Sequence, residues 1–258
     1  MTNRPSSPGM EQAAQLIRSA RRVVALTGAG ISTPSGIPDY RSPKTGAWET
    51  QDPMAIASVT AFHNQPQRFY AEWLRPLATR CFEAQPNAAH LALVQLEQAG
   101  KLDVILTQNV DLLHSRAGSR NVIELHGSLA NFHCPRCGKT YPGDPHYQEL
   151  IENGSIPHCT ACQTILKPNI VLFGDPLSQT AWLSATQYAQ ECDLMLVIGS
   201  SLNVGPVNLL PHFAIELGVP FIILTRSETP LDEKATLTLH DDLAEILPTI
   251  VSLALEVG

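Results

Sequence analysis

The sequence predicts an α/β fold built on an open parallel, Rossmann-like sheet with helices on both faces. A small lobe made of a four-cysteine zinc ribbon and a helical insertion is expected beside it. Apolar runs of strand length alternate with stretches whose apolar residues recur every three or four positions, as in alternating strands and helices. The first run enters a glycine-rich loop, and two C-x-x-C pairs in one segment predict the ribbon.

Each element is predicted from the period of its apolar residues and from the glycine, proline and polar residues around it. The predicted strands lie at residues 23–26, 104–107, 121–125, 194–198, 221–224 and 236–239. The predicted helices lie at residues 11–20, 66–77, 87–98, 179–190 and 207–217. We expect one catalytic domain over residues 1–258. Its Rossmann-like lobe is expected at about 10–43, 101–126 and 169–258, its helical insertion at about 44–100 and its zinc-binding insertion at about 127–168.

Composition limits the classes of partner. The chain of 258 residues has 17 Lys and Arg against 24 Asp and Glu, a formal net charge of -7. An acidic chain is a poor binder of nucleic acid or of anionic membranes. The polar, proline-rich start lacks the apolar core of a signal peptide, and no run approaches the ~20 apolar residues of a membrane span. We therefore expect a cytoplasmic protein of undetermined oligomeric state.

Four of the six cysteines form two C-x-x-C pairs separated by 21 residues. They are Cys134, Cys137, Cys159 and Cys162. This spacing predicts one zinc ion held by four thiolates, and because no coordination position stays open the metal is expected to be structural. A redox pair or scattered buried thiols are the alternatives, and His133 or His158 could replace a ligand. Cys81 and Cys192 are interpreted as buried core thiols.

The segment after the first strand reads TGAGISTPSGIPDYRS. Gly28 and Gly30 have no Cβ, so we expect them to let the backbone approach a diphosphate. A dinucleotide-binding loop would carry a third glycine where Thr33 stands, and three prolines follow. Because proline cannot continue a helical ladder, an irregular segment is expected over the dinucleotide. Such a cover suits an enzyme that cleaves its dinucleotide better than one that transfers a hydride.

Polar and small residues follow four of the predicted strands. They are Gly28 to Gly30, Gln108 to Asp111, Gly199 to Ser201, and Thr225. Taken singly, each has a structural explanation as a helix cap or a turn. Together they occupy one rim of a parallel sheet, which is where such sheets bind ligands.

His126 follows an extended segment and immediately precedes the zinc insertion. An imidazole with an ordinary pKa of ~6.5 can accept a proton near neutral pH. A single histidine is more often structural, but the junction of two lobes is a usual place for a cleft. His114, one turn into a short predicted helix, is interpreted as a packing or hydrogen-bonding residue.

Six blocks of the chain, in order, resemble the sirtuins, the NAD-dependent protein lysine deacylases. The blocks are GAGISTPSGIPDYR, TQNVDLLH, ELHG, the paired C-x-x-C knuckles, NIVLFGD and GSSLNV. The resemblance covers roughly residues 15–250 and is closest in pattern to bacterial and archaeal members. It implies NAD as co-substrate, one structural zinc ion and acyl-lysine proteins or peptides as partners.

The resemblance also implies roles for individual residues. The catalytic residues would be His126, Asn109 and Asp111. The NAD site would consist of Ala29, Gly30, Thr33, Ile37, Tyr40, Arg41, Gln108, Asn109, Val110, Asp111, His126, Gly199, Ser200, Ser201, Thr225 and Asp242. An extended substrate peptide would pair with Val171, Phe173 and Gly174 as an added strand.

The implied reaction begins when the acyl-lysine oxygen attacks ribose C1′ of NAD and nicotinamide leaves. His126 would then draw a proton from a ribose hydroxyl, which attacks the acyl carbon. The products would be free lysine, nicotinamide and O-acyl-ADP-ribose. The alternative is mono-ADP-ribosyl transfer to protein at the same NAD site.

Three departures from the sirtuin pattern affect specificity. Thr225 stands where many members have asparagine, and Asp175 with Pro176 replaces a glutamate–asparagine pair. The Tyr-x-x-Arg of succinyl-removing members matches Tyr70 and Trp73, so the arginine is missing. A buried Glu72 or Trp73 would offer no bidentate partner to a carboxylate, so acetyl or other uncharged acyl groups are expected, although Arg75 lies close in sequence.

Two further functions compete with deacylation as explanations of the sequence. A dehydrogenase would use Glu49, 21 residues after Gly28, as its ribose-binding acid, but the intervening prolines break the required strand–helix–strand unit. A catalytically idle NAD sensor or zinc-ribbon adaptor would not need Asn109, Asp111 and His126 together.

Overall fold

The computed structural model describes residues 7–39 and 52–256. Its large sheet has six strands in the order β3-β2-β1-β7-β8-β9, and every neighbouring pair is parallel. The strands are β1 (Val23–Thr27), β2 (Leu102–Thr107), β3 (Val122–Glu124), β7 (Leu194–Ile198), β8 (Phe221–Leu224) and β9 (Leu237–Leu239). The strand order reverses between β1 and β7, which makes that point the expected place for a ligand.

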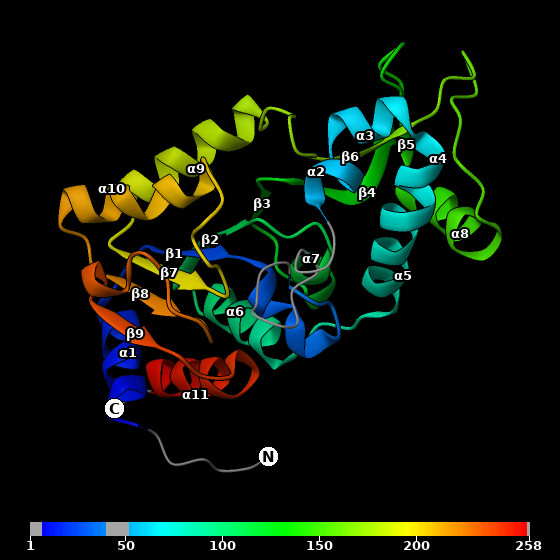
Figure 1. Cartoon of the computed structure of the whole chain (residues 1–258). Helices are drawn as coiled ribbons and strands as arrows, with labels where there is room; N and C mark the ends of the chain where they lie inside the picture. Colours follow the sequence, from blue (N-terminus) through cyan, green and yellow to red (C-terminus); the bar gives the residue numbers. More distant parts are fainter. Residues whose placement is uncertain (1–6, 40–51, 257–258) are drawn as a thin grey trace.

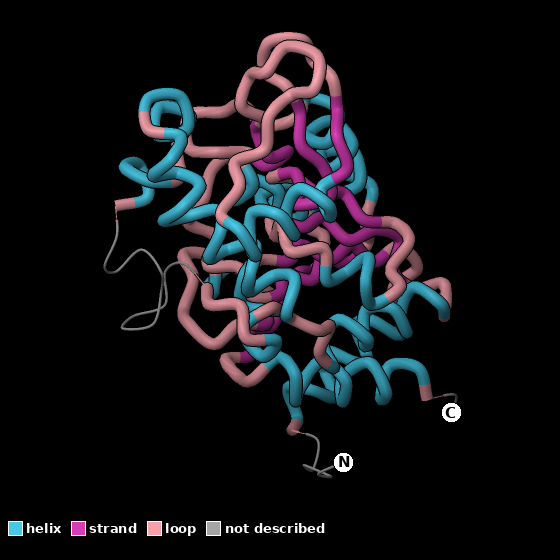
Figure 2. The backbone as a smooth tube through the Cα atoms, turned by 90° about the vertical axis from the view of Figure 1, so that its right-hand side faces the viewer, coloured by secondary structure: helices cyan, strands magenta, loops and turns pink. Residues whose placement is uncertain are grey.

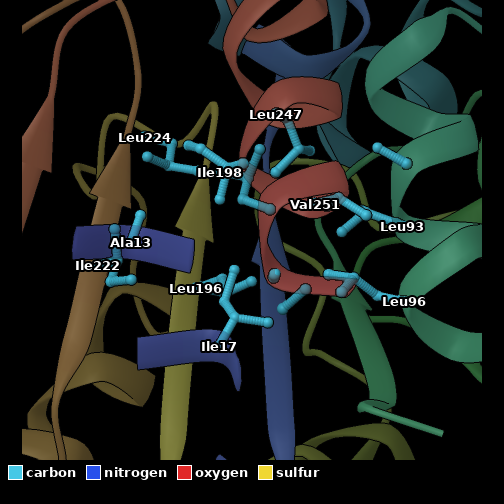
Figure 3. Close-up of a cluster of buried hydrophobic side chains, with 14 of the residues drawn as sticks. Ala13, Ile17, Leu93, Leu96, Leu196, Ile198, Ile222, Leu224, Leu247 and Val251 are labelled. Atoms are coloured by element: carbon cyan, nitrogen blue, oxygen red, sulfur yellow. The ribbon is translucent and has the colours of Figure 1, made fainter. Parts of the chain in front are cut away.

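Helices cover both faces of this sheet, as predicted (Figure 1). One face carries α1 (Pro8–Ser19), α6 (Ala88–Gln98) and α11 (Leu243–Leu255), and the other carries α9 (Gln179–Glu191) and α10 (Leu210–Leu217). Figure 3 shows Leu196, Ile198 and Leu224 of the strands beside Leu247 and Val251 of α11. Because both faces are covered, β1, β7 and β8 are buried at every residue, which explains why they read as unbroken apolar runs.

Two parts of this arrangement differ from the expectation. Helix α6, assigned to the helical insertion at 44–100, is the crossover between β1 and β2 and packs its buried Leu93 and Leu96 into the core under the sheet. Helix α11 was not predicted, and its Ile246 and Ile250 are fully buried in the same core. We call the six-stranded sheet with its five helices the large lobe.

The small lobe is built on an antiparallel sheet in the order β5-β4-β6. Its strands are β4 (Gly127–His133), β5 (Thr140–Pro142) and β6 (Lys167–Ile170). Its helices are α2 (Pro53–Ile56), α3 (Val59–Asn64), α4 (Pro66–Arg68), a π-helical turn (Phe69–Leu74), α5 (Arg75–Glu83) and α8 (Gly143–Asn153). Phe132 and Tyr147, whose ring centroids lie 4.5 Å apart, belong to its separate core.

The chain passes from the large lobe into the small lobe between β3 and β4, and Figure 2 shows the strands running through the middle of the molecule with helices outside them. Strand β6 extends to Ile170, beyond the boundary expected at residue 168, because its residues pair with β4. The predicted helix at 66–77 continues to Glu83 through the π-helical turn. No helix within residues 7–39 and 52–256 is long and apolar enough to cross a membrane.

Candidate active site

One cavity of about 1320 Å³ lies at the carboxyl edge of the large sheet and reaches the small lobe. Sixteen predicted site residues line it. They are Ala29, Gly30, Thr33, Ile37, Gln108, Asn109, Val110, Asp111, His126, Val171, Phe173, Gly174, Gly199, Ser200, Ser201 and Thr225. Tyr40 and Arg41 lie outside the described residues, as does Glu49. Strand ends that are far apart in the sequence therefore meet at one site, as the rim argument predicted.

Glycines at the strand-order reversal bring two loops into backbone contact. The Gly30 N–H donates to the Gly199 carbonyl at 2.8 Å. A Cβ on Gly28 would lie 2.8 Å from the Gly199 oxygen, and one on Gly199 would lie 2.4 Å from the Ile31 nitrogen. The atoms that a Cβ on Gly28 or Gly30 would meet belong to the neighbouring loop, and the approach of a diphosphate to these glycines stays a prediction.

The loop after β1 forms two short 3₁₀ turns, Ala29–Ile31 and Thr33–Ser35, and no longer helix up to residue 39. Asn87 connects the two turns, because its Nδ2 donates to the Ile31 carbonyl at 2.8 Å and to Ser35 Oγ at 2.9 Å. Its Oδ1 accepts from the Ala89 N–H and caps α6. The sequence analysis missed Asn87 as a support of the site, because a residue before a helix indicates only a cap.

A buried hydrogen-bond network joins the loops after β1 and β2. The Ser32 hydroxyl donates to Asp111 Oδ2 at 2.7 Å, and Asn109 Nδ2 donates to Ser32 Oγ at 3.2 Å and to the Gly28 carbonyl at 3.1 Å. The Leu113 N–H donates to Asp111 Oδ1 at 2.9 Å. Burial raises the pKa of Asp111, which is 6% exposed, and the bonds from Leu113 and Ser32 oppose this rise. Ser32 links the two candidate residues and was also missed.

His114 lies behind this network and does not line the cavity. Its Nε2 is 2.9 Å from Thr27 Oγ1, which donates to Thr107 Oγ1, and Thr107 Oγ1 accepts from the Asn109 N–H. Burial, and then the neighbouring His90, lower the pKa of His114 to about 3. A neutral, buried hydrogen-bonding residue agrees with the interpretation that His114 is structural.

His126 stands at the junction of the lobes, between β3 and β4. Its Nδ1 lies 3.0 Å from the Gln108 carbonyl oxygen. Because a carbonyl can only accept, this contact places the ring proton on Nδ1 and leaves the lone pair on Nε2. Gln108 in turn donates from Nε2 to Ser200 Oγ at 2.8 Å, which connects the ends of β2 and β7.

Gly127 allows this junction to close. Its φ is +68°, and a Cβ there would lie 2.1 Å from the Asn169 carbonyl oxygen. Gly127 is the register partner of Ile170, so the close approach aligns β4 with β6 directly after His126. The turn after the candidate base therefore depends on the absence of a side chain.

The four paired cysteines converge as predicted, with all their sulfur atoms within 4.8 Å of one another. Cys134 Sγ lies 3.4 Å from Cys162 Sγ, and Cys137 Sγ lies 3.6 Å from Cys159 Sγ. Tetrahedral zinc with Zn–S bonds of about 2.3 Å would separate its sulfurs by about 3.8 Å, so the four thiols fit zinc. His133 and His158 are not in this cluster, which favours the four-cysteine interpretation.

The two zinc knuckles have matching backbones with one difference. In the first, the Gly138 N–H donates to the Cys134 carbonyl, and in the second the Gln163 N–H donates to the Cys159 carbonyl. Both residues are left-handed, with φ of +72° and +60°.

The Tyr141 hydroxyl, 3.1 Å from Cys159 Sγ, lowers the pKa of that thiol to about 6.

Comparison with known proteins identifies the family. A family model described as the Sir2 family matches residues 28–206, more than half of the chain. The chain belongs to the Sir2 family. An NAD-dependent protein deacetylase of Sulfurisphaera tokodaii is 42% identical over 241 residues, which cover 93% of this chain and 94% of that protein.

Solved Sir2 structures share the fold over nearly the whole chain. A Sir2–p53 peptide–NAD⁺ complex is 37% identical with a TM-score of 0.85, covering 94% of this chain and 97% of that one. A Sir2 mutant with deacetylated p53 peptide and 3′-O-acetyl ADP-ribose has a TM-score of 0.88 at 37% identity and the same coverage. The predicted fold class and the family resemblance are confirmed.

In this Sir2 chain the expected peptide-pairing segment is only partly extended. The Phe173 N–H donates to the Ala57 carbonyl and the Phe173 carbonyl accepts from the Val59 N–H, both at 3.0 Å. Gly174, with φ of +92°, sits in a tight turn closed by the Asp175 N–H donating to the Leu172 carbonyl at 2.9 Å. One edge of Phe173 therefore pairs with the small lobe, and the pairing of Val171, Phe173 and Gly174 with a substrate peptide stays a prediction.

At the β8 end, Thr225 lines the cavity but Asp242 does not. Asp242 Oδ1 accepts from the Ala244 N–H and caps α11, and its Oδ2 forms an ion pair with Arg226. Leu243, the next residue, reaches the cavity instead. The carboxylate of Asp242 therefore serves as the cap of α11, and a contact between the backbone near Asp242 and NAD stays a prediction.

The small-lobe end of the Sir2 cavity is apolar. Trp73, Leu77 and Cys81 line it at four-residue intervals along one helix face. Tyr70 is fully buried, with its hydroxyl donating to the Leu166 carbonyl. Glu72 was expected to be buried but is exposed, and it pairs with Arg68, four residues earlier, at 2.8 Å. Arg75 donates to the Ile151 carbonyl from both Nε and Nη2.

Proposed function

We propose that this protein is an NAD-dependent protein lysine deacetylase that removes acetyl and other uncharged acyl groups. The observation that carries the proposal is the meeting of His126 with the Asn109–Ser32–Asp111 network in one cavity. The deacetylase relatives, and the Sir2 structure that holds a deacetylated peptide with acetyl ADP-ribose, support deacylation over ADP-ribosyl transfer to protein.

The cavity has the size and lining that NAD requires. Its volume of about 1320 Å³ exceeds the usual range for one small molecule, roughly 300–1,000 Å³, so a dinucleotide and an acyl-lysine side chain have room together. Small residues and hydrogen-bonding side chains from four strand ends line one part of it, and apolar residues of the small lobe line another. NAD, when bound, supplies the ribose carbon that receives the acyl oxygen and the nicotinamide that leaves.

The network at Asn109 and Asp111 is suited to orient a carboxamide. Each carboxylate oxygen of Asp111 already accepts one hydrogen bond, from Ser32 or Leu113, and each can accept another. These bonds hold Asp111 in place before any ligand arrives, so little orientation must be fixed during the reaction. Among the described residues that line the cavity there is no lysine, and Arg226, at the β8 end, pairs with Asp242.

His126 has the tautomer that a general base needs. The Gln108 carbonyl accepts from Nδ1–H, so Nε2 is the atom that takes a proton from a hydroxyl in the cavity. The side-chain amide of Gln108 donates to Ser200 Oγ. This bond restrains Gln108, whose backbone carbonyl orients the His126 ring. We assign the proton transfer to Nε2 of His126.

The four cysteines would hold zinc as a structural ion, because four protein ligands complete its coordination and leave no position for substrate. All six cysteines are free thiols, in keeping with the reducing cytoplasm that we propose for this protein. The proposed partners are acyl-lysine-bearing proteins or peptides.

The apolar end of the cavity is the proposed acyl site. Trp73, Leu77 and Cys81 offer no charge to a dicarboxylic acyl group. Arg75 and Arg68 are directed to other partners, and the Tyr70 hydroxyl is already bonded. Burying an unpaired carboxylate here would be costly, so acetyl is expected to be removed faster than succinyl.

The test is incubation of the purified protein with NAD and an acetyl-lysine peptide, followed by mass spectrometry. We expect deacetylated peptide, nicotinamide and O-acetyl-ADP-ribose in equal amounts. His126→Ala should lower turnover by at least about a hundredfold while zinc content and folding persist, whereas the exposed His63→Ala should leave turnover unchanged. An ADP-ribosylated peptide would support the rival function, and full activity of a folded His126→Ala would remove the assigned base.

A further inference from the structure

One wall of the cavity is held by a buried ion pair that the sequence did not indicate. Lys167 opens β6 and is only 8% exposed. Its Nζ lies 2.7 Å from Asp175 Oδ2, and Asp175 belongs to the turn that lines the cavity. Both charges are largely removed from water, so their pairing depends on close geometry.

The ion pair joins the two ends of the segment from residue 167 to residue 175. Lys167 Nζ also donates to the Ile170 carbonyl at 3.0 Å, at the last residue of β6. Asp175 Oδ2 also accepts from the Leu172 N–H at 3.0 Å. One ammonium and one carboxylate oxygen therefore hold together the end of β6 and the Leu172-to-Asp175 turn.

The segment within this closure carries the contacts that face the reaction. Val171 N–H donates to the His126 carbonyl at 2.8 Å, which ties the segment to the candidate base. Phe173 is fixed to Ala57 and Val59 on the side of the small lobe. The position of Asp175 thus affects the peptide-facing wall and the backbone of His126 together.

We propose that Lys167 is a positioning residue for the peptide substrate. Its ion pair with Asp175 holds residues 171–174 in the shape that receives an acyl-lysine peptide. The inference rests on the proposed function. It gives Asp175, which replaces the glutamate common in sirtuins, a defined role as the partner of Lys167.

The pair also connects the peptide wall to the zinc-binding sheet. Lys167 is the register partner of His133, and Pro168 is that of Phe132. His133 directly precedes the first zinc-knuckle cysteine. Strand pairing therefore links the residue that precedes the zinc knuckle to the lysine that forms the ion pair with Asp175.

The test measures peptide and NAD separately. Acetyl-lysine peptide binding to the zinc-loaded protein is followed by fluorescence anisotropy, and KM is determined for each substrate. Lys167→Met should raise the peptide Kd and peptide KM on the order of tenfold, while the Kd for NAD alone changes by less than about twofold. Lys167→Arg keeps the charge and should recover most of the peptide binding.

Two further variants control for folding. Arg22→Met removes ion pairs with Asp103 and Glu191 at the start of β1, away from the cavity, and should leave the peptide Kd unchanged. If Lys167→Met does not fold, Asp175→Asn takes its place, because it keeps an oxygen for the Leu172 N–H and removes only the charge.

An unchanged peptide Kd in a folded Lys167 or Asp175 variant would overturn the inference, as would an equal loss of NAD binding. Failure of the proposed function is a different result. In that case the wild-type protein binds the peptide but releases no deacetylated product, and the effect of Lys167 on peptide binding is still measured.

Discussion

Different interactions stabilise the interior of each lobe. In the large lobe, β1, β7 and β8 are buried at every residue beneath helices on both faces, and the site residues follow from where the strands end. In the small lobe, a separate apolar core is joined by four converging thiols and one buried ion pair. The large lobe therefore positions its site residues mainly through strand ends, whereas the small lobe adds specific side-chain bonds to its core.

The lobes are joined where His126 stands, so each supplies part of the candidate site. The large lobe provides the Asn109–Ser32–Asp111 network and the small lobe provides the peptide wall and the apolar end. We therefore expect each lobe to unfold without the other when its own stabilising contacts are removed. A change at the junction should affect both lobes.

The largest effect is expected at the junction. Gly127→Ala would place a Cβ 2.1 Å from the Asn169 carbonyl, so β6 must move away from β4. We expect a loss of about 3 kcal/mol in the free energy of unfolding and at least a hundredfold loss of turnover, roughly. Gly100→Ala is the matched control, because Gly100 has φ of +70° and nothing within 4 Å. Equal effects of the two changes would contradict the close approach at Gly127.

Removal of zinc should affect one lobe only. Chelation leaves four thiols without the metal that cross-links them, and such sites supply folding free energy on the order of 10 kcal/mol in small zinc domains. Hydrogen exchange should become fast in β4, β5 and β6 and stay slow in β1 and β7, while peptide turnover is lost. Fast exchange throughout would show that the large lobe also depends on the metal.

Acid should weaken the large lobe through its buried histidines. Burial lowers the pKa of His114 to about 3 and that of His90 to about 4. The unfolded chain therefore binds more protons below the ordinary pKa of ~6.5, and stability falls with falling pH. At pH 5 His114 alone should lower the free energy of unfolding by about 2 kcal/mol relative to pH 7.

Urea unfolding at the two pH values measures this effect. His114→Gln, which keeps a donor for Thr27, should remove most of that difference, and the exposed His63→Gln should not. An unchanged pH dependence in His114→Gln would mean that this histidine is not neutral when folded.

The smallest effect is expected in the second zinc knuckle. Gln163 adopts φ of +60°, where Gly138 stands in the first knuckle. Gln163→Gly relieves the left-handed strain but adds entropy to the unfolded chain, for a net gain of up to about 1 kcal/mol. Thermal unfolding of the zinc-loaded protein measures it, and Gly138→Ala should change stability in the opposite direction.

The pattern of apolar residues predicted element boundaries correctly for two strands that are buried on both faces. Strands β7 and β8 match their predicted ranges, since both of their faces are covered and the run of apolar residues ends where the strand ends. Helix α11 was missed because it follows the last predicted strand and carries Pro248 within an apolar run. The π-helical turn after Arg68 has no sequence signal of this kind, and the expected burial of Glu72 within it was wrong.

Local sequence determined which residue types are present and which strand end carries each: the glycine loops, the Gln108-to-Asp111 turn, His126 and the cysteine pairs. The tertiary structure decided what those residues touch. Gly28 meets Gly199 because the strand order reverses there, Ser32 joins Asn109 to Asp111, and Lys167 reaches Asp175 around a turn. Spacing along a chain encodes local conformation, but contacts between distant loops depend on how the sheet and the small lobe pack against each other.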